Sequence, residues 1–238
     1  MRIYKCPVCK DTGIIIFSET VKGYSYPLER AVECECAVRR RHELICKNAG
    51  FNLAEAKNLN DYQVVNETTG QARMKAEEYI RGFDAIRRSG KNWFLVFGQS
   101  GSGKTMLGRA IVKALIERAR PVRARAVKYA EMMQVLKSKS NDTDYGQILD
   151  RYTDCELLFI DDLLKDKAFY GEMTEADIKH LFAVIDTRYD ARRPTIITTE
   201  CTWHRIDELN EAIYGRMLER KFASIIFDSK DSNYRKRA

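Results

Sequence analysis

The sequence predicts an α/β fold in which helices flank a central parallel sheet, preceded by a small cysteine-rich head. Two observations support this prediction. From Lys91 onward, short apolar runs of strand length alternate with amphipathic stretches of helical spacing, as in βαβ units. Five of the seven cysteines lie within residues 1–48, ahead of that alternation. A chain of 238 residues has room for one full-sized core and a small appendage, which excludes two large domains.

The composition narrows the classes of function. Hydrophobic residues make up 45% of the chain and charged residues 32%, which is typical of a globular protein rather than a disordered one. No apolar run approaches the ~18 residues of a membrane span, and the N-terminal stretch lacks the apolar core of a signal peptide. We therefore expect a cytoplasmic protein without a membrane partner. The net charge of +7 is compatible with nucleic-acid binding, although many basic proteins simply carry solvated charge.

Three segments follow one another along the chain. Residues 1–48 form the cysteine-rich head, residues 49–90 form a polar linker followed by a helix, and residues 91–238 carry the sheet. Apolar runs in the third segment predict buried strands, and apolar residues at helical spacing predict the helices between them. The predicted strands cover residues 93–97, 123–127, 157–160 and 195–199, and the predicted helices cover residues 104–118, 130–136 and 178–189.

A glycine-rich segment directly follows the first predicted strand. Its sequence, GQSGSGKT over residues 98–105, matches the pattern G-x-x-x-x-G-K-[ST] of phosphate-binding loops. Glycines let backbone N–H groups approach phosphate oxygens, and the positive end of the following helix points at the same anion. We expect Lys104 to reach the β and γ phosphates of a nucleotide and Thr105 to give a hydroxyl ligand to Mg²⁺. The residues expected to bind the nucleotide are Gly98, Ser100, Gly101, Ser102, Gly103, Lys104, Thr105 and Met106.

Two acidic residues end the apolar strand at 157–160. In a protein with a phosphate loop, we expect Asp161 to bind Mg²⁺ through water and Asp162 to orient or deprotonate the attacking water. The alternative is that both are plain polar residues at a strand end. The strand at 195–199 also has a polar end. In one large class of ATPases that carry a phosphate loop, a residue at such a strand end senses the γ phosphate, and by that resemblance Thr199 or Glu200 is a candidate here; the alternative is a plain strand terminus.

The cysteines of the head are arranged as two close pairs. A C-x2-C pair has the ordinary spacing of a zinc ribbon, because two thiolates on one tight turn can share a tetrahedral metal, whereas the C-x-C pair is less usual. We predict that four thiolates bind Zn²⁺, namely those of Cys6, Cys9, Cys34 and Cys36. His42 or Cys46 is an alternative to one of them, and four reduced structural cysteines are the plain alternative. A head of under fifty residues has too little core to be stable alone, so a metal makes physical sense.

Two arginines near the C-terminus lie at helical spacing. Arg216 and Arg220 are four residues apart, which puts them on one face of a helix. An arginine supplied by a neighbouring subunit is a known way to stabilise the charge of phosphoryl transfer. The alternative is a solvated basic face.

Two basic runs and two aromatic residues are candidates for DNA contact. The runs at 38–41 and 118–125 have the charge to bind the phosphates of single-stranded DNA, or are solvated charge. Tyr129 and Phe169 are candidates to stack on bases, although isolated aromatic residues more often lie in the core.

Taken together, these motifs resemble those of the DnaC/DnaI-type bacterial and phage replicative helicase loaders, a branch of the AAA+ ATPases. The resemblance runs from about residue 51 to the end of the chain. It is carried by GQSGSGKT, LLFIDDL, TRYDARRPTIITTE, GRMLER and the tail DSNYRKRA. The phosphate loop is common to many NTPases, whereas the spaced set is much more specific. The N-terminal CPVCKDTG, with CEC after it, looks like the cysteine-rich head of the DnaI-like and phage members.

The resemblance implies an AAA+ ATPase domain over residues 91–238 that binds and hydrolyses ATP with Mg²⁺ at subunit interfaces. It implies a homo-oligomer that loads a hexameric, DnaB-like replicative helicase onto single-stranded DNA, with the head in contact with the helicase. By position, the arginine finger falls on Arg220, with Arg216 beside it, and the sensor arginine falls on Arg235. The first sensor, usually asparagine, falls on Glu200, where a carboxylate repels the γ phosphate unless it is protonated or turned away.

Three other interpretations remain open. A transposition-helper ATPase of the IstB type shares the ATPase core and works on duplex DNA, but lacks a comparable cysteine module. An adaptor that is stabilised by zinc and binds ATP with little turnover is motivated by Glu200. A small-molecule kinase has no use for an arginine from a neighbouring subunit or for a cysteine-rich head.

Overall fold

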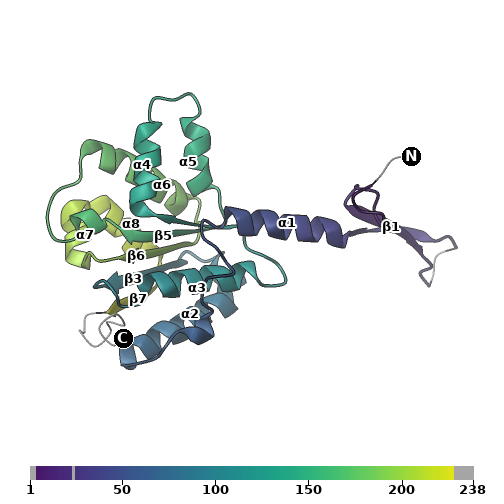
Figure 1. Ribbon diagram of the computed structural model, residues 1–238, viewed down its shortest axis with the longest axis horizontal. Helices are drawn as coiled ribbons and strands as arrows, with labels where there is room; N and C mark the ends of the chain where they lie inside the picture. Colours follow the sequence, from purple (N-terminus) through teal and green to yellow (C-terminus); the bar gives the residue numbers. More distant parts are fainter. Residues whose placement is uncertain (1–3, 23–24, 228–238) are drawn as a thin grey trace. The chain divides into compact units, whose positions relative to one another are not determined.

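The computed structural model describes residues 4–22 and 25–227 (Figure 1). The chain divides into two compact units, Met1–Lys47 and Asn48–Ala238. Within the described ranges, no helix combines the length and the apolar character that a membrane crossing requires.

The first unit consists of an antiparallel hairpin and a helix. Strands β1 (Ile14–Glu19) and β2 (Leu28–Glu33) pair antiparallel, with Ile16 opposite Ala31. Helix α1 (Glu35–Asn48) follows at once and continues past the boundary of the unit. Most side chains of both strands are exposed, so the hairpin adds little to a hydrophobic core. This unit therefore needs another source of stability, as domains of this size generally do.

The second unit is built on a sheet of five parallel strands in the order β4-β5-β6-β3-β7. These strands are β3 (Trp93–Gly98), β4 (Ala124–Lys128), β5 (Leu157–Leu163), β6 (Thr195–Thr199) and β7 (Lys221–Phe227). The side chains of β3, β5 and β6 are buried almost throughout, because helices cover both faces of the sheet. The predicted parallel sheet with flanking helices is confirmed, and β7 is a strand that the sequence analysis did not predict.

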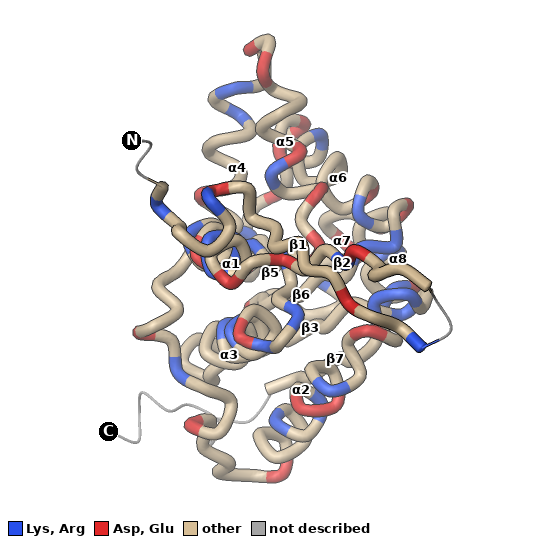
Figure 2. Tube along the Cα trace, turned by 90° about the vertical axis from the view of Figure 1, so that its right-hand side faces the viewer, with Lys and Arg blue, Asp and Glu red and all other residues tan. Residues whose placement is uncertain are grey.

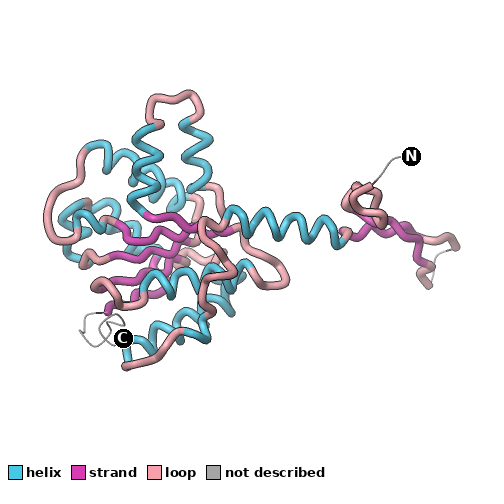
Figure 3. The backbone as a smooth tube through the Cα atoms, in the orientation of Figure 1, coloured by secondary structure: helices cyan, strands magenta, loops and turns pink. Residues whose placement is uncertain are grey.

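Helices lie on both sides of this sheet (Figure 3). On one side, Phe94 of β3 packs edge-on against Tyr79, with 5.4 Å between the ring centroids. On the other side, Trp93, Leu95 and Phe97 join the large core cluster with residues of α4 to α8. The helices are α2 (Glu67–Ile86), α3 (Lys104–Ile116), α4 (Tyr129–Ser138), α5 (Tyr145–Thr153), α6 (Glu175–Asp190), α7 (Trp203–Leu209) and α8 (Glu211–Arg220), with short 3-10 turns η1 (Leu59–Asp61) and η2 (Lys165–Lys167).

Some element boundaries differ from the predicted ones for local reasons. Helix α6 begins three residues before the predicted range, because the Thr174 side chain caps it by accepting a hydrogen bond from the N–H of Asp177. Helix α5 was not predicted, because the residues that it buries are few and give a weak helical pattern. They are Ile148, Tyr152 and Thr153. Helix α2 packs on β7 and α3, so the helix predicted in the 49–90 segment belongs to the second unit.

A buried arginine connects α6 to the segments that lead into β5 and β6, at the end of the sheet opposite the phosphate loop. Arg188 of α6 is fully buried, and no carboxylate pairs with it among the ion pairs of the described residues. Its guanidinium donates instead to main-chain carbonyls and to one hydroxyl, on Tyr152, Thr153, Cys155, Pro194 and Thr195. These hydrogen bonds join α6 to the chain that enters β5 and β6. Burial lowers the pKa of Arg188.

Candidate nucleotide site and cysteine cluster

The phosphate-loop segment makes a tight turn between β3 and α3. Gly98, Gly101 and Gly103 have φ angles of 141°, 83° and 84°, a region that residues with a side chain rarely adopt. At Gly98 a Cβ atom would lie 2.6 Å from the Cβ of Phe227, so the close approach of β7 also requires glycine. The loop therefore brings its main chain, rather than side chains, to the start of α3, where backbone N–H groups suit an anion.

The lysine of the loop is held by main-chain oxygens. Lys104 Nζ donates to the carbonyl oxygen of Gly98 at 2.7 Å and to that of Gln99 at 2.8 Å. The residue is only 4% exposed. Burial lowers the pKa of Lys104, and the carboxylates of Glu200 and Asp162 oppose that shift. The ammonium of Lys104 thus lies over the loop, with acidic groups near it. In this position it can replace its hydrogen bonds to the two carbonyl oxygens by hydrogen bonds to phosphate oxygens.

Thr105 and Asp161, the two residues predicted to bind Mg²⁺, lie in contact with each other. Thr105 Oγ1 donates to Asp161 Oδ1 at 2.9 Å, across 56 residues of sequence. Thr198 of β6 donates to the same oxygen at 2.6 Å. Asp161 is 5% exposed. A hydroxyl and a carboxylate in contact at the end of a phosphate loop form a donor set of oxygen atoms, which is the chemistry that Mg²⁺ prefers.

The second acidic residue sits at a bend of β5. Asp162 has a left-handed φ of 58°, and the pairing of β5 with β6 shifts between Ile160 and Leu163. The N–H of Asp162 donates to Thr198 Oγ1 at 3.0 Å, which fixes the bend. Its carboxylate pairs with Lys165 at 2.9 Å. Aspartate tolerates the left-handed region better than most residues, and strain of this kind often accompanies a functional position.

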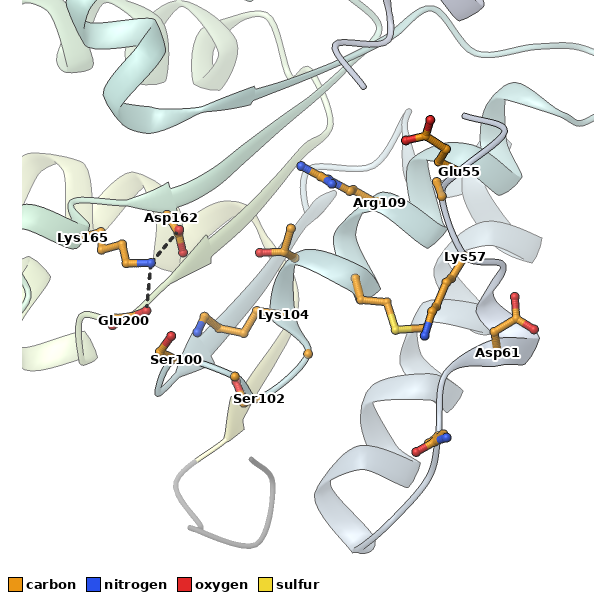
Figure 4. Close-up of a pocket in the computed structure, with 16 residues that line it drawn as sticks. Glu55, Lys57, Asp61, Ser100, Ser102, Lys104, Arg109, Asp162, Lys165 and Glu200 are labelled. Carbon is orange, nitrogen blue, oxygen red and sulfur yellow. Dashed lines mark hydrogen bonds and ion pairs between the residues drawn. The ribbon is translucent and has the colours of Figure 1, made fainter. Parts of the chain in front are cut away.

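A pocket of about 540 Å³ collects most of these residues (Figure 4). Its volume is within the usual range for small-molecule sites. One end carries Lys104, Asp162 and Glu200, and the other end carries Glu55 and Asp61 of the segment before α2. The complete lining is Glu55, Ala56, Lys57, Asp61, Gln63, Ser100, Gly101, Ser102, Gly103, Lys104, Thr105, Met106, Arg109, Asp162, Lys165 and Glu200. The lining of the pocket therefore runs from the phosphate loop to the segment before α2.

Of the two sensor candidates, only one lines the pocket. Thr199 is buried, and its hydroxyl donates to the carbonyl oxygen of Leu163 at 2.7 Å. Glu200 lines the pocket, and its carboxylate forms an ion pair with Lys165 at 3.3 Å. The sequence analysis named neither Thr198 nor Lys165. The sequence did hold a signal for Thr198: it is next to Thr199, and because successive side chains of a strand point to opposite faces, one of these two threonines faces the side of the sheet that the other does not. The sequence held no signal for Lys165.

Both arginines of α8 form hydrogen bonds with other residues of the same chain. The Arg220 guanidinium donates to the carbonyl oxygens of Gly90 and Tyr189, and the residue is 8% exposed. Arg216 Nε donates to Asp186 at 2.6 Å, and its side chain keeps a quarter of its surface exposed. A role of Arg220 across a subunit junction thus requires two hydrogen bonds to break. Arg235, the predicted sensor arginine, lies outside the described residues.

The basic run at 118–125, in the second unit, is partly neutralised. Arg118 pairs with Asp84, and Arg123 pairs with Glu156. Figure 2 shows acidic residues among the basic ones on most helices of this unit. This mixture favours the plain interpretation of the 118–125 run as solvated, paired charge.

The two aromatic candidates have opposite environments. Tyr129 is 4% exposed and belongs to the core, so it is not available to stack on a base. Phe169 is 74% exposed, and Tyr170 beside it is 86% exposed. The exposed pair follows η2, separated from it by Ala168.

The four predicted cysteine ligands come together in the first unit. Their Sγ atoms all lie within 4.8 Å of one another. Cys6 and Cys34 are 3.8 Å apart between sulfurs, and Cys9 and Cys36 are 3.4 Å apart. Zn–S bonds of about 2.3 Å in a tetrahedron put the sulfurs about 3.8 Å apart, so these separations fit a zinc ion and are far too long for disulfides.

The surroundings of the sulfurs also suit a metal. Burial opposes ionisation of Cys9, but the N–H of Gly13 and the neighbouring thiols outweigh it and lower the pKa of Cys9 to about 6. The hydrogen bond with Cys9, together with burial, raises the pKa of Cys36 to about 12. Four thiols this close ionise together only with a cation between them. The alternatives His42 and Cys46 contact each other, at 3.5 Å, and are not part of the four-sulfur group.

Sequence comparison assigns most of the chain to one group of proteins. The family model described as IstB-like ATP binding protein matches residues 17–238, a range that excludes Cys6 and Cys9. Two relatives from Bacillus subtilis (strain 168) are similar over nearly the whole chain. The uncharacterized protein YqaM is 26% identical, and the match covers 90% of this chain and 79% of YqaM. The phage-like element PBSX protein XkdC is 25% identical, and the match covers 91% of this chain and 79% of XkdC.

Comparison with solved structures gives the same fold. The solved structure of the DnaC helicase loader superposes with a TM-score of 0.64 and 21% identity, over 74% of this chain and 98% of the chain in that structure. The solved structure of DnaI superposes with a TM-score of 0.61 and 19% identity, over 73% of this chain and 92% of the chain in that structure. At this level of identity the likeness shows the fold alone. The predicted AAA+ fold and the resemblance to the DnaC/DnaI type are confirmed.

Proposed function

The chain belongs to the family of IstB-like ATP-binding proteins, and we propose that it is an ATPase that loads a hexameric replicative helicase onto single-stranded DNA. One observation carries this proposal. The match with the solved structure of the DnaC helicase loader covers 74% of this chain and 98% of the chain in that structure, and a pocket lined by the phosphate loop lies in the second unit. The replicative helicase and the DNA are inferred from that similarity.

The nucleotide would bind along the pocket with its phosphates over the loop. Lys104 is placed to exchange the carbonyls of Gly98 and Gln99 for phosphate oxygens. Thr105 and Asp161 would hold Mg²⁺, which supplies positive charge to the β and γ phosphates. The segment around Lys57 and Asp61 lines the far end and would face the base and the sugar.

Asp162 is the residue we assign to the attacking water. Its carboxylate lines the phosphate end of the pocket, and the left-handed bend of β5 sets its direction. As a general base or an orienting acceptor, it would take a hydrogen bond from water next to the γ phosphate. An arginine from a neighbouring copy, Arg216 or Arg220, would complete the charge stabilisation.

The first unit is the part we assign to the helicase. The four-cysteine group would hold one Zn²⁺, which stabilises a unit whose strands bury little surface. The exposed apolar side chains of its hairpin, Ile14, Ile16 and Val32, are 51%, 66% and 44% exposed. Apolar surface of this kind is suited to contact with another protein.

Single-stranded DNA would contact the exposed aromatic pair Phe169 and Tyr170. Bases of any sequence stack on such rings, at about 1–3 kcal/mol per base. Changing both residues to alanine should weaken binding of single-stranded DNA at fixed salt, while Tyr26→Ala, at an exposed position of the first unit, should not. Equal weakening by both changes would refute the assignment of this pair.

The direct test is co-purification with candidate replicative helicases. We expect the full chain, with ATP and Mg²⁺, to form a complex with its cognate hexameric helicase and to increase helicase assembly on a single-stranded circle. The matched control is Lys104→Ala, which removes the ammonium of the loop. If no complex forms with ATP, with ADP or without nucleotide, the loader proposal is wrong.

A second candidate is a transposition-helper ATPase, and the description of the matching family favours it. Such a protein acts on duplex DNA with a transposase. Measuring affinity for single-stranded and duplex DNA of the same length at fixed salt separates the two functions. A clear preference for duplex DNA, with no helicase complex, would favour the transposition helper.

A further inference from the structure

Three charged side chains meet at the phosphate end of the pocket. Lys165 Nζ lies 2.9 Å from Asp162 Oδ2 and 3.3 Å from Glu200 Oε1, so one ammonium bridges two carboxylates (Figure 4). All three residues line the pocket. The bridge joins the end of β5 to the residue after β6, and it lies beside Lys104.

The backbone before Lys165 is bent in a way that brings its side chain back toward β5. Asp162 and Leu164 both have left-handed φ angles, 58° and 53°. A leucine side chain has no polar group that could compensate for this conformation by a hydrogen bond, and the side chain of Leu164 is buried. Strain of this kind persists where the surrounding structure imposes it, often at functional positions. The short turn η2 then begins with Lys165 itself.

Glu200 depends on this lysine for charge compensation. Its side chain is 9% exposed, and Lys165 is its one ion-pair partner within residues 4–22 and 25–227. The other ammonium nearby, that of Lys104, donates to the carbonyl oxygens of Gly98 and Gln99. A nearly buried carboxylate without a paired cation is costly, and next to a phosphate it is also repulsive.

We propose that Lys165 makes the pocket selective for a nucleoside triphosphate over a diphosphate, by neutralising Glu200 where the γ phosphate would lie and by positioning Asp162. This inference rests on the proposed nucleotide site. A neutral side chain at position 200 would need no such cation, whereas Glu200 does. Without the ammonium, Glu200 would repel the terminal phosphate of ATP, and ADP, which has no group there, would be affected much less.

The chain provides a matched control for this lysine. Lys167 lies in the same short turn, pairs with Asp166 and does not line the pocket. Lys165→Met and Lys167→Met therefore remove one positive charge each from neighbouring positions, with only the first facing the phosphate end. Glu200→Gln removes the carboxylate while leaving the shape of the side chain nearly unchanged.

The test is calorimetric titration of the full chain with Mg²⁺ and either ADP or a non-hydrolysable ATP analogue. We expect Lys165→Met to weaken binding of the ATP analogue about tenfold or more and to change ADP binding less than about threefold. Lys167→Met should change neither. The double variant Lys165→Met with Glu200→Gln should recover most of the affinity for the ATP analogue, because the uncompensated carboxylate is gone.

The hydrolysis rate separates the two effects of the lysine. In the double variant we expect the affinity to return while the maximal rate stays low, because Asp162 has lost its partner. Lys165→Arg should retain much of both. Thermal unfolding of each variant checks that it is folded, and Glu200→Gln alone keeps the inference testable if Lys165→Met does not fold. That single change should leave binding of the ATP analogue as tight or tighter.

Two failures would be distinguishable. If the unchanged, folded chain binds neither nucleotide, the proposed nucleotide site itself is wrong. If it binds both, but Lys165→Met weakens them equally or not at all, the site stands and the role of Lys165 is overturned. A weaker binding of the ATP analogue in Glu200→Gln would overturn it as well.

Discussion

The Thr198 hydroxyl lies 2.6 Å from Asp161 Oδ1 and donates a hydrogen bond to it. The same hydroxyl accepts a hydrogen bond from the N–H of Asp162 at 3.0 Å. One side chain of β6 thus fixes the direction of the first acidic residue and the backbone of the second. Residues that orient a metal ligand in this way affect the metal site almost as strongly as the ligand does.

Changing Thr198 to valine should therefore impair the site while keeping the size of the side chain. We expect Mg²⁺-dependent ATP hydrolysis to fall about tenfold to a hundredfold, because Asp161 loses its orienting donor and the bend at Asp162 loses its acceptor. The measurement is the rate of phosphate release against Mg²⁺ concentration. Thr198→Ser, which keeps the hydroxyl, is the control and should retain most of the rate. An unchanged rate in the valine variant would contradict this role.

The buried Arg188 should be a major source of stability of the second unit. Arg188→Met removes the hydrogen bonds that the guanidinium donates to four carbonyls and the Thr195 hydroxyl in a buried site, so we expect a loss of about 3–5 kcal/mol. Both tryptophans of the chain, Trp93 and Trp203, lie in the second unit, so denaturation followed by tryptophan fluorescence reports on it.

The control for Arg188 is Arg123→Met, which removes an exposed arginine paired with Glu156. A surface pair of this kind contributes about 0–1 kcal/mol. Similar losses in the two variants would show that the buried hydrogen bonds of Arg188 contribute little.

The cysteine cluster should hold one zinc ion per chain. Metal analysis of the purified full chain should give about one zinc, and Cys9→Ser should lose most of it, because a tetrahedral site needs all four ligands. Cys46→Ser is the matched control, since this residue lies outside the four-sulfur group. Full zinc content in Cys9→Ser, or its loss in Cys46→Ser, would show that the ligand set is different.

His180 should make the second unit less stable in mild acid. Its side chain is 2% exposed, and the Tyr145 hydroxyl lies 2.7 Å from its Nδ1. Burial lowers the pKa of His180, Lys179 and Lys137 lower it further, and Asp177 opposes them. The unfolded chain, where this histidine titrates near 6.5, then binds more protons than the folded one. The stabilisation is present above that pH and is lost as the pH falls below it.

The measurement is the free energy of unfolding between pH 7.5 and about 5 by tryptophan fluorescence. In His180→Gln, the loss of stability toward acid should be smaller than in the unchanged chain. His204→Gln, at an exposed position of α7, is the matched control. The same reduction in both variants would contradict the assignment to His180.

The two arginines of α8 should have different roles, with Arg220 stabilising the fold and Arg216 acting between subunits. Arg220 is buried against Tyr189 and donates to two carbonyls, so Arg220→Ala should lower thermal stability. Arg216 is more exposed, and we expect Arg216→Ala to lower hydrolysis with a smaller loss of stability. If an arginine acts across a junction, mixing inactive Lys104→Ala chains with inactive Arg216→Ala chains should restore part of the activity. No recovery, in mixtures that do assemble, would place the site within one chain.

Much of this protein could be predicted from its sequence, because the relevant signals are local. The phosphate loop is eight consecutive residues, so its pattern predicted the turn between β3 and α3 that is found. Buried strands of a parallel sheet are apolar throughout, and the strand at Thr195–Thr199 lies where it was predicted. Close cysteine pairs predicted a four-sulfur group in the same way.

Other features were decided only by tertiary structure. The choice of Thr198 over Thr199 depends on which side chain of β6 lies on the same face of the sheet as the Asp161 carboxylate, and a shift of one residue in register would exchange the two. The bridge from Lys165 to Glu200 depends on two left-handed residues that no sequence pattern indicates. The burial of Arg220 depends on contacts with Gly90 and Tyr189, far away in the chain. A sequence pattern records neighbours along the chain, whereas burial and pairing depend on which distant segments pack together.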